Sequence, residues 1–237
     1  MARGFNATLG AANTDGVLTA LTSLNGLRSY AIWTYRRTGA APTNVIWNYS
    51  VSTEFFISTS ASVYDYYRAW SGNDGRWTIA LPSADAWHHI LITYNSGSTA
   101  NNPTIYVDGV SVTVTETSSP SGVLSTVAGQ YDIGRLAGNT LAWDGSLAEF
   151  AVWNRILDAA EAKSVYLSSP LAVPRDLVEY VPLLRENVSL KLDAPTITGT
   201  AVQPHPRVMY HYRPQSIAPT AAPAVTRRSM LPLLGVG

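Results

Sequence analysis

The sequence predicts an all-β protein built as a sandwich of antiparallel sheets. Short segments rich in Val, Ile, Thr, Tyr and Trp recur along the chain, and turn-forming residues separate them. No long helical segments are interleaved with these strands, which argues against an α/β protein. Charged residues make up only 14% of the 237 residues, which is low for a helical protein. Many short strands with turns between them are typical of β sandwiches.

The strand candidates follow one another at regular spacing. Turn signals such as Gly72-Asn73-Asp74-Gly75, Asp108-Gly109 and Asp144-Gly145 separate them. The expected strands are a first edge strand at 5–10 and then 30–37, 45–50, 54–60, 62–70, 76–80, 87–94, 104–107, 111–116, 130–134 and 147–153.

The segment 87–109 lies at the centre of this pattern. Its first strand alternates, so that Ile90, Ile92 and Tyr94 fall on one face. A polar loop follows, and the second strand ends in Asp108-Gly109, a hairpin turn signal. The segment therefore predicts two strands joined by a long loop.

One short helix is expected at 158–168. Asp158 can cap its amino end, and Glu161 three residues later completes a capping box. Ala162, Val165 and Tyr166 form an apolar stripe that would pack against the sandwich. We interpret this helix as structural.

Two segments resemble the laminin-G-like, concanavalin A-like lectin domain. The first is the run from Trp87-His88-His89 to the Tyr-Val-Asp-Gly that ends at Gly109. The second keeps the register of the family over residues 143–162. Its matching residues are Gly145, Leu147, Glu149, Val152, Trp153, Asn154, Arg155, Leu157 and Glu161. The resemblance implies a two-sheet jelly-roll sandwich, the concanavalin A-like fold, over residues 1–170.

The remainder, 171–237, is predicted to be an extended, Pro-rich, basic C-terminal arm. Ten of the fourteen prolines lie from Pro170 onward, and no acidic residue occurs at 194–237. Proline restricts the strand-like pieces of this segment to sheet edges. The arm has too little apolar surface for a core of its own. Its assembly contacts would come from His205, Arg207, Tyr210, Tyr212, Arg213, Arg227 and Arg228.

The arm carries a second resemblance, to the tail of stand-alone laminin-G-like proteins encoded by tailed bacteriophages. Its most specific piece runs from Gly199-Thr200 to His205-Pro206-Arg207-Val208. The chain has no cysteine, a formal net charge of zero and no apolar signal core near its start. We therefore expect synthesis in the host cytoplasm, location in the virion, and neither a membrane nor a nucleic acid as partner.

Catalysis is not expected. Glucanases of this fold carry a Glu-x-Asp-x-x-Glu strand, because retaining hydrolysis needs two closely spaced carboxylates. No such triplet occurs, and the nearest acidic grouping, Asp144 with Glu149, fits a turn of the family.

No cofactor is predicted, although Ca²⁺ stays possible. The family often holds this ion with loop carboxylates, which suit a hard cation. Ala148 replaces one expected ligand, which leaves the loop carboxylates Asp15, Asp74, Asp132 and Asp144, with Asp15 and Asp144 as the candidates. Each of the four is more simply interpreted as a turn residue that caps its own backbone. His88 and His89 are adjacent on a strand and point to opposite faces, so they cannot share a metal ion. One should be packed and the other should lie at the surface.

A glycan site would need exposed aromatic rings beside polar loop residues. The richest such group is Tyr64, Tyr66, Trp70, Asn73 and Asp74, with Tyr64 and Tyr66 on one face and Tyr67 on the other. A sandwich core also consumes aromatic residues, so we favour core packing or a protein interface for these rings.

Two functions remain. The favoured one is a non-enzymatic virion structural protein, a capsid decoration or tail accessory protein. Its partners would be other virion proteins and copies of itself, contacted through the arm. The alternative is a carbohydrate-binding module or adhesin that recognises a host surface glycan. An intracellular enzyme is a distant third.

Overall fold

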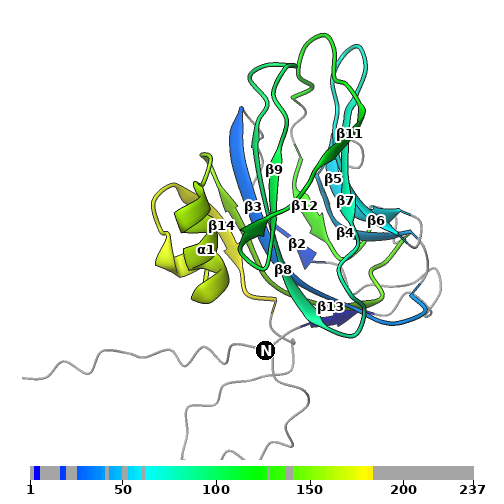
Figure 1. Cartoon of the computed structure of the whole chain (residues 1–237), viewed down its shortest axis with the longest axis vertical. Coiled ribbons are helices and arrows are strands. Elements are labelled where there is room, and N and C mark those ends of the chain that lie inside the picture. Colours follow the sequence, from blue (N-terminus) through cyan, green and yellow to red (C-terminus); the bar gives the residue numbers. More distant parts are fainter. Residues whose placement is uncertain are drawn as a thin grey trace, which may run out of the picture. The chain divides into compact units, whose positions relative to one another are not determined.

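The computed structural model describes residues 3–5, 17–19, 26–40, 43–49, 53–59, 62–126, 129–136 and 141–183. It is a jelly-roll sandwich of two seven-stranded sheets (Figure 1). Sheet A contains β1 (Arg3–Phe5), β3 (Leu27–Arg36), β8 (Trp87–Asn95), β9 (Thr104–Val107), β10 (Val110–Ser111), β13 (Gly145–Trp153) and β14 (Leu177–Val181). Sheet B contains β2 (Val17–Leu18), β4 (Asn44–Tyr49), β5 (Glu54–Thr59), β6 (Val63–Arg68), β7 (Gly75–Ala80), β11 (Thr115–Ser118) and β12 (Tyr131–Ile133).

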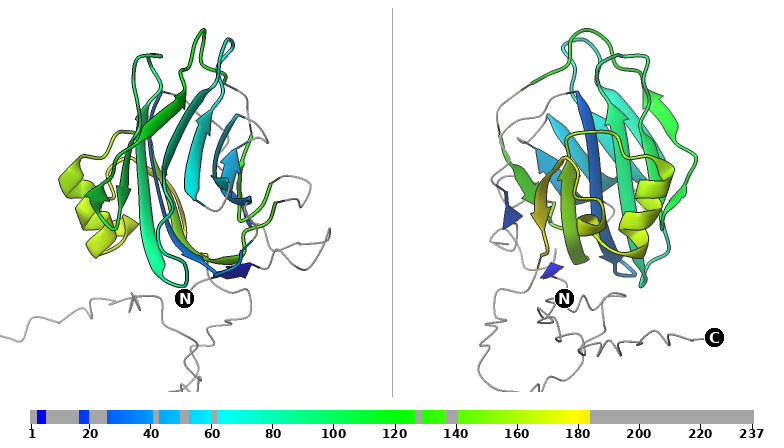
Figure 2. Two further views of the ribbon diagram at one scale, coloured as in Figure 1. Left: turned by 45° about the vertical axis from the view of Figure 1, so that its right-hand side comes forward. Right: turned by 90° about the vertical axis from the view of Figure 1, so that its left-hand side faces the viewer.

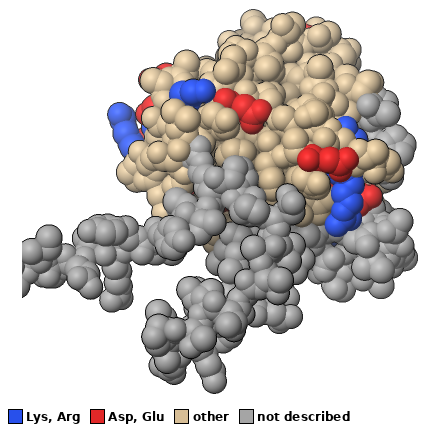
Figure 3. Space-filling view, turned by 60° about the horizontal axis from the view of Figure 1, so that its bottom comes forward, with Lys and Arg blue, Asp and Glu red and all other residues tan. Residues whose placement is uncertain are grey.

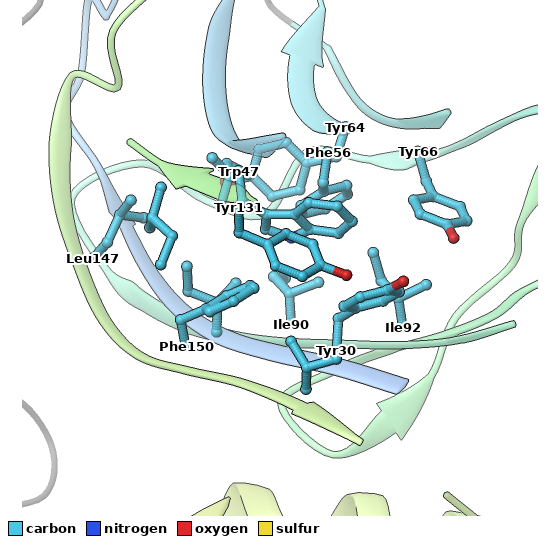
Figure 4. Close-up of a cluster of buried hydrophobic side chains, with 14 of the residues drawn as sticks. Tyr30, Trp47, Phe56, Tyr64, Tyr66, Ile90, Ile92, Tyr131, Leu147 and Phe150 are labelled. Atoms are coloured by element: carbon cyan, nitrogen blue, oxygen red, sulfur yellow. The ribbon is translucent and has the colours of Figure 1, made fainter. Parts of the chain in front are cut away.

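The main core lies between the two sheets and is rich in aromatic rings (Figure 4). Trp47 lies among Tyr30, Phe56, Tyr131 and Phe150, with ring centroids 4.7–6.4 Å away. All five rings are buried. Successive side chains of a strand point to opposite faces of the sheet, and these residues all lie on the inner face. The strands that carry them are among those that the sequence predicts.

A second core covers the outer face of sheet A. Helix α1 (Ala159–Leu167) lies on this face, on the side away from sheet B (Figure 2). Its Ala162 and Val165 pack with Leu91 and Trp153 of the sheet. The predicted capping box is confirmed, because the Asp158 side chain accepts from the amide of Glu161 and Glu161 returns the bond.

The central segment forms the predicted elements, and its turn has the expected conformation. Strands β9 and β10 pair as a hairpin in which Val107 lies opposite Val110. The two turn residues, Asp108 and Gly109, have φ values of 52° and 74°. Two consecutive positive φ angles are those of the tight hairpin turn that Asp-Gly favours.

Two predicted elements differ in the structure. The expected strand 111–116 is two strands, since β10 ends at Ser111 in sheet A and β11 begins at Thr115 in sheet B. The chain therefore crosses between sheets where one strand was expected. Most of the expected first strand at 5–10 lies outside the described residues.

The domain boundary predicted at residue 170 is too early. Strand β14 pairs antiparallel with β13, and Leu183 reaches the main core with 3% of its surface exposed. The pairing of β14 at a sheet edge agrees with the proline restriction in this segment. The sandwich thus extends to residue 183, and the assembly residues predicted between His205 and Arg228 lie outside the described part.

Candidate functional site

The rings predicted to bind a glycan belong to the core. Tyr64 and Tyr66 are 2% and 0% exposed and point between the sheets, and Trp70 is 7% exposed. A sugar stacks on a ring face that it can reach, so these buried rings cannot form its platform. The sugar platform is therefore wrong for these rings, and core packing, the preferred interpretation, is confirmed for Tyr64 and Tyr66. The alternation of side chains along the strand predicts that Tyr64 and Tyr66 share one face, but it does not indicate whether that face is internal.

The polar members of the predicted platform stabilise a turn. One oxygen of Asp74 accepts from the Tyr67 hydroxyl at 2.6 Å, and the other accepts from the amide of Trp70 at 3.0 Å. Asn73 is exposed, and its backbone amide donates to the Ser121 hydroxyl at 2.8 Å. Asp74 therefore holds the β6–β7 connection and has little left to offer a ligand.

Tyr67 lies on the outer face of sheet B, opposite to Tyr66. It stacks on Phe55 of the neighbouring strand, with ring centroids 4.2 Å apart and planes 2° apart. Arg76 lies 5.9 Å from the Tyr67 ring centroid and pairs with Asp65 at 2.5 Å. Because each ring covers a face of the other, this row offers a sugar less stacking surface than free rings would.

Of the two residues predicted to bind calcium, the structure describes Asp144 alone. Asp144 pairs with Arg37 at 2.7 Å, and Asp15 lies outside the described residues. Nowhere among the described residues do three His, Asp or Glu side chains gather closely enough to hold a metal ion. A hard cation needs several oxygen ligands at once, and Asp144 alone cannot supply them.

The histidine pair divides as predicted. His89 is 1% exposed and lies against the rings of Trp33 and Tyr166, at 5.1 and 5.9 Å. His88 is partly exposed, with Nδ1 at 2.8 Å from the Asp108 carboxylate and Nε2 at 2.9 Å from the Ser83 hydroxyl. The other Asp108 oxygen accepts from the His89 amide at 2.9 Å.

The hydrogen bonds of Ser83, His88 and Asp108 have the connectivity of a Ser-His-Asp triad, which the sequence analysis did not anticipate. A working triad also needs a substrate pocket and oxyanion donors beside the serine. None of the three residues lines either of the cavities described below. These three residues have a structural role, because their hydrogen bonds tie the β9–β10 hairpin to β8 and to the turn before β8.

A buried polar cluster joins the sheets inside the core. Glu54 accepts hydrogen bonds from the hydroxyls of Tyr30, at 2.8 Å, and Tyr66, and it lies 3.6 Å from the Arg68 guanidinium. Burial raises the pKa of Glu54, while Arg68 and both phenols oppose this. The adjoining cavity of about 10 Å³ is near the lower limit for a single water, roughly 10–15 Å³, and is too small for a sugar.

An open groove of about 310 Å³ lies on the outer face of sheet A, beside the long β8–β9 loop. This volume falls within the range of small-ligand sites, roughly 300–1,000 Å³. Ile92, Tyr94 and Ile105 point into the core, so the alternating neighbours on β8 and β9 point to the groove side. The residues that line it are Thr93, Asn95, Ala100, Asn101, Asn102, Thr104 and Ile156.

Side-chain hydrogen bonds hold the loop that forms one wall of this groove. Asn95 accepts from the amide of Gly97 at 3.0 Å, and Asn101 donates to the carbonyl of Asn95 at 2.9 Å. Asn102 accepts from the indole of Trp77, a fully buried residue of sheet B, at 2.7 Å. The loop is thus anchored to the core, and its amide groups are placed before any ligand arrives.

The surface charges are mixed in sign. On the face shown in Figure 3, Lys and Arg lie beside Asp and Glu rather than in a patch of one sign. Nucleic-acid binding uses a basic patch, which is not visible on that face. None of the described helices has the length and apolar character needed to cross a membrane.

Among solved structures, two share this architecture with TM-scores above 0.5. A candidate carbohydrate binding protein from Bacteroides ovatus ATCC 8483 is 17% identical, with a TM-score of 0.52, over 70% of this chain and 48% of that one. A mutant of HCR/D is 11% identical, with a TM-score of 0.51, over 69% and 41%. The heptameric SAP-like pentraxin from Limulus polyphemus is 15% identical, with a TM-score of 0.46, over 69% and 80%.

This chain therefore spans about half or less of the first two proteins, and at these identities the likeness shows the fold alone. No match occurs among curated proteins. One family model matches residues 11–163, which is more than half of the chain. By this match and by its two-sheet architecture, the chain belongs to the Laminin_G_3 family of the concanavalin A-like lectin/glucanases superfamily.

Proposed function

We propose that this protein is a non-enzymatic lectin-like protein that binds a host surface glycan through the groove beside the β8–β9 loop. The observation that carries the proposal is the lining of the groove, in which Asn95, Asn101, Asn102, Thr93 and Thr104 supply amides and hydroxyls. Such groups bind the edges of sugars by hydrogen bonds. Membership of a lectin superfamily and the B. ovatus neighbour support the same function.

The direct test is a glycan array probed with the full-length protein, with and without calcium. Binding to a defined set of host surface glycans, weakened when a groove residue is changed, is the expected outcome. An array without any binding would overturn the proposal.

The non-enzymatic part needs its own test, because Ser83, His88 and Asp108 are connected like a triad. A fluorophosphonate probe labels an activated serine and is expected to leave Ser83 unlabelled. Labelling that disappears in both Ser83→Ala and His88→Gln would show an activated nucleophile. That result would replace the non-enzymatic proposal with a hydrolytic one.

We also propose that the protein is a virion structural component of a tailed bacteriophage, as a capsid decoration or tail accessory protein. The specific observation is the segment 194–237, which is rich in proline, has four arginines and lacks acidic residues. In this proposal the sandwich is displayed outward and the segment contacts other virion proteins and copies of the chain.

Deletion of 194–237 separates the two proposals. A structural component should lose incorporation into particles, while a lectin should bind its glycan unchanged. Both results together would support a displayed lectin. Normal incorporation of the deleted protein would contradict the virion role.

A further inference from the structure

The side-chain amides in the groove have fixed orientations, because each forms a hydrogen bond with a group that can only donate or only accept. The indole nitrogen of Trp77 can only donate, so the Asn102 atom that it contacts at 2.7 Å must be the amide oxygen. The backbone amide of Gly97 likewise fixes the oxygen of Asn95 at 3.0 Å. Both bonds leave the amide nitrogens of Asn95 and Asn102 available as donors to a ligand.

Asn101 has the opposite orientation, with its amide nitrogen rather than its oxygen already engaged. Its amide nitrogen donates to the carbonyl of Asn95 at 2.9 Å, which leaves its oxygen as an acceptor. Thr104 adds a hydroxyl, which can both donate and accept, from the exposed end of β9. The Thr93 hydroxyl is buried and already donates to the Thr104 carbonyl at 3.4 Å. Apart from it, the groove presents two donors, one acceptor and one hydroxyl that can do either.

The remaining lining is uncharged. None of the seven residues around the groove carries a charge at any ordinary pH. Ile156 is 37% exposed and, with Ala100, supplies the apolar part of the lining. An anionic ligand would lose water here without gaining a countercharge, which is costly for an ionised group.

We infer that the groove selects neutral, hydroxyl-rich sugars over acidic ones such as sialylated or uronic acid glycans. The inference rests on the proposed function and adds the chemical class of the glycan that is bound. Adjacent sugar hydroxyls match a set of donors and acceptors, since each hydroxyl can give one hydrogen bond and accept others. The apolar C–H side of the ring would pack on Ile156.

The test compares glycan pairs that differ only in a terminal acid, for example lactose and 3′-sialyllactose and other neutral oligosaccharides with their acidic forms. The full-length protein should bind neutral members, with an affinity that changes little between 50 and 500 mM NaCl. Thr104→Val should weaken this binding about tenfold, because it removes one hydrogen-bonding hydroxyl at nearly constant shape.

The matched control is Thr115→Val, on an exposed strand of sheet B that does not line the groove, which should bind like the wild type. Binding that requires the acid and weakens steeply with salt would overturn the neutral specificity while leaving glycan binding intact. Neutral binding that Thr104→Val leaves unchanged would place the site elsewhere and overturn the inference. An array without binding would overturn the proposed function itself.

Discussion

The hydroxyl of Tyr30 on β3 donates to the carboxylate of Glu54 on β5 across the interior of the sandwich, at 2.8 Å. Glu54 is also directly opposite Arg68 in the β5–β6 pairing, and both are 2% exposed. One carboxylate therefore links the two sheets and compensates a buried guanidinium. Removing one partner of such a pair leaves an uncompensated charge in the core.

Glu54→Gln is expected to destabilise the protein by about 3 kcal/mol, because Arg68 would lose its countercharge in the core. The measurement is urea unfolding followed by fluorescence. The double variant Glu54→Gln/Arg68→Met should recover part of the loss, since it removes both charges. A single variant as stable as the wild type would mean that water reaches Arg68.

Stability should fall as the pH rises above 10. Burial raises the pKa of both Tyr64 and Tyr94 from 10.0 to about 12. Between these values the unfolded chain releases phenolic protons that the folded protein keeps, so rising pH favours unfolding. The contribution of these two phenols to the stability is complete below pH 10 and is progressively lost as the pH approaches 12. Unfolding free energies at pH 9, 10 and 11 should decline less steeply in Tyr64→Phe than in the wild type.

The cap of α1 can be tested with a conservative pair of variants. Asp158 accepts from the Glu161 amide at 2.8 Å and Glu161 accepts from the Asp158 amide at 3.1 Å. Asp158→Ala should cost about 1 kcal/mol, whereas Asp158→Asn, which can still cap the helix, should cost much less. Thermal unfolding compares the two, and equal losses would show that the charge rather than the cap matters.

The position of the domain boundary predicts different behaviour for two truncations. A chain ending at residue 170 lacks β14, the buried Leu183 and the Val173 carbonyl that accepts from the Trp153 indole at 2.7 Å. It should unfold at a much lower temperature and aggregate through the uncovered edge of β13. A chain ending at residue 183 should keep the melting temperature of the full-length protein.

Light scattering on the 183-residue chain and the full-length chain tests assembly. If 184–237 drives self-association, the 183-residue chain should be monomeric and the full-length chain oligomeric. A stable 170-residue chain would contradict the contribution of β14 to the fold.

The sequence predicts the order of the strands well, because alternation and turn chemistry are local. The Asp108-Gly109 turn and the Asp158 cap depend on a few neighbouring residues, and both formed as expected. The contents of the faces are harder to predict, since alternation shows which residues share a face but not which face is internal. Tyr64 and Tyr66 illustrate this ambiguity.

The groove and the buried cluster depend on contacts between distant segments. The Trp77–Asn102 hydrogen bond joins a strand of one sheet to a loop of the other, and no local pattern indicates it. Glu54 and Arg68 gave a usable signal that the sequence analysis missed. Each shares a strand face with core residues, Phe56 or Tyr66, and that placement indicates a buried charge in need of a partner.

The order of strands in sheet A has a consequence for how the protein is made. Strand β3 finishes by residue 36 but pairs with β13, which begins only at residue 145. Arg28 and Asn154, 126 residues apart, are in direct contact through this pairing. Most of the domain must leave the ribosome before β3 can pair on this side, and contacts of such long range slow folding. Until then the nascent chain presents an open sheet edge, and chaperone capacity should limit its yield in a heterologous host more than the stability of the finished sandwich does.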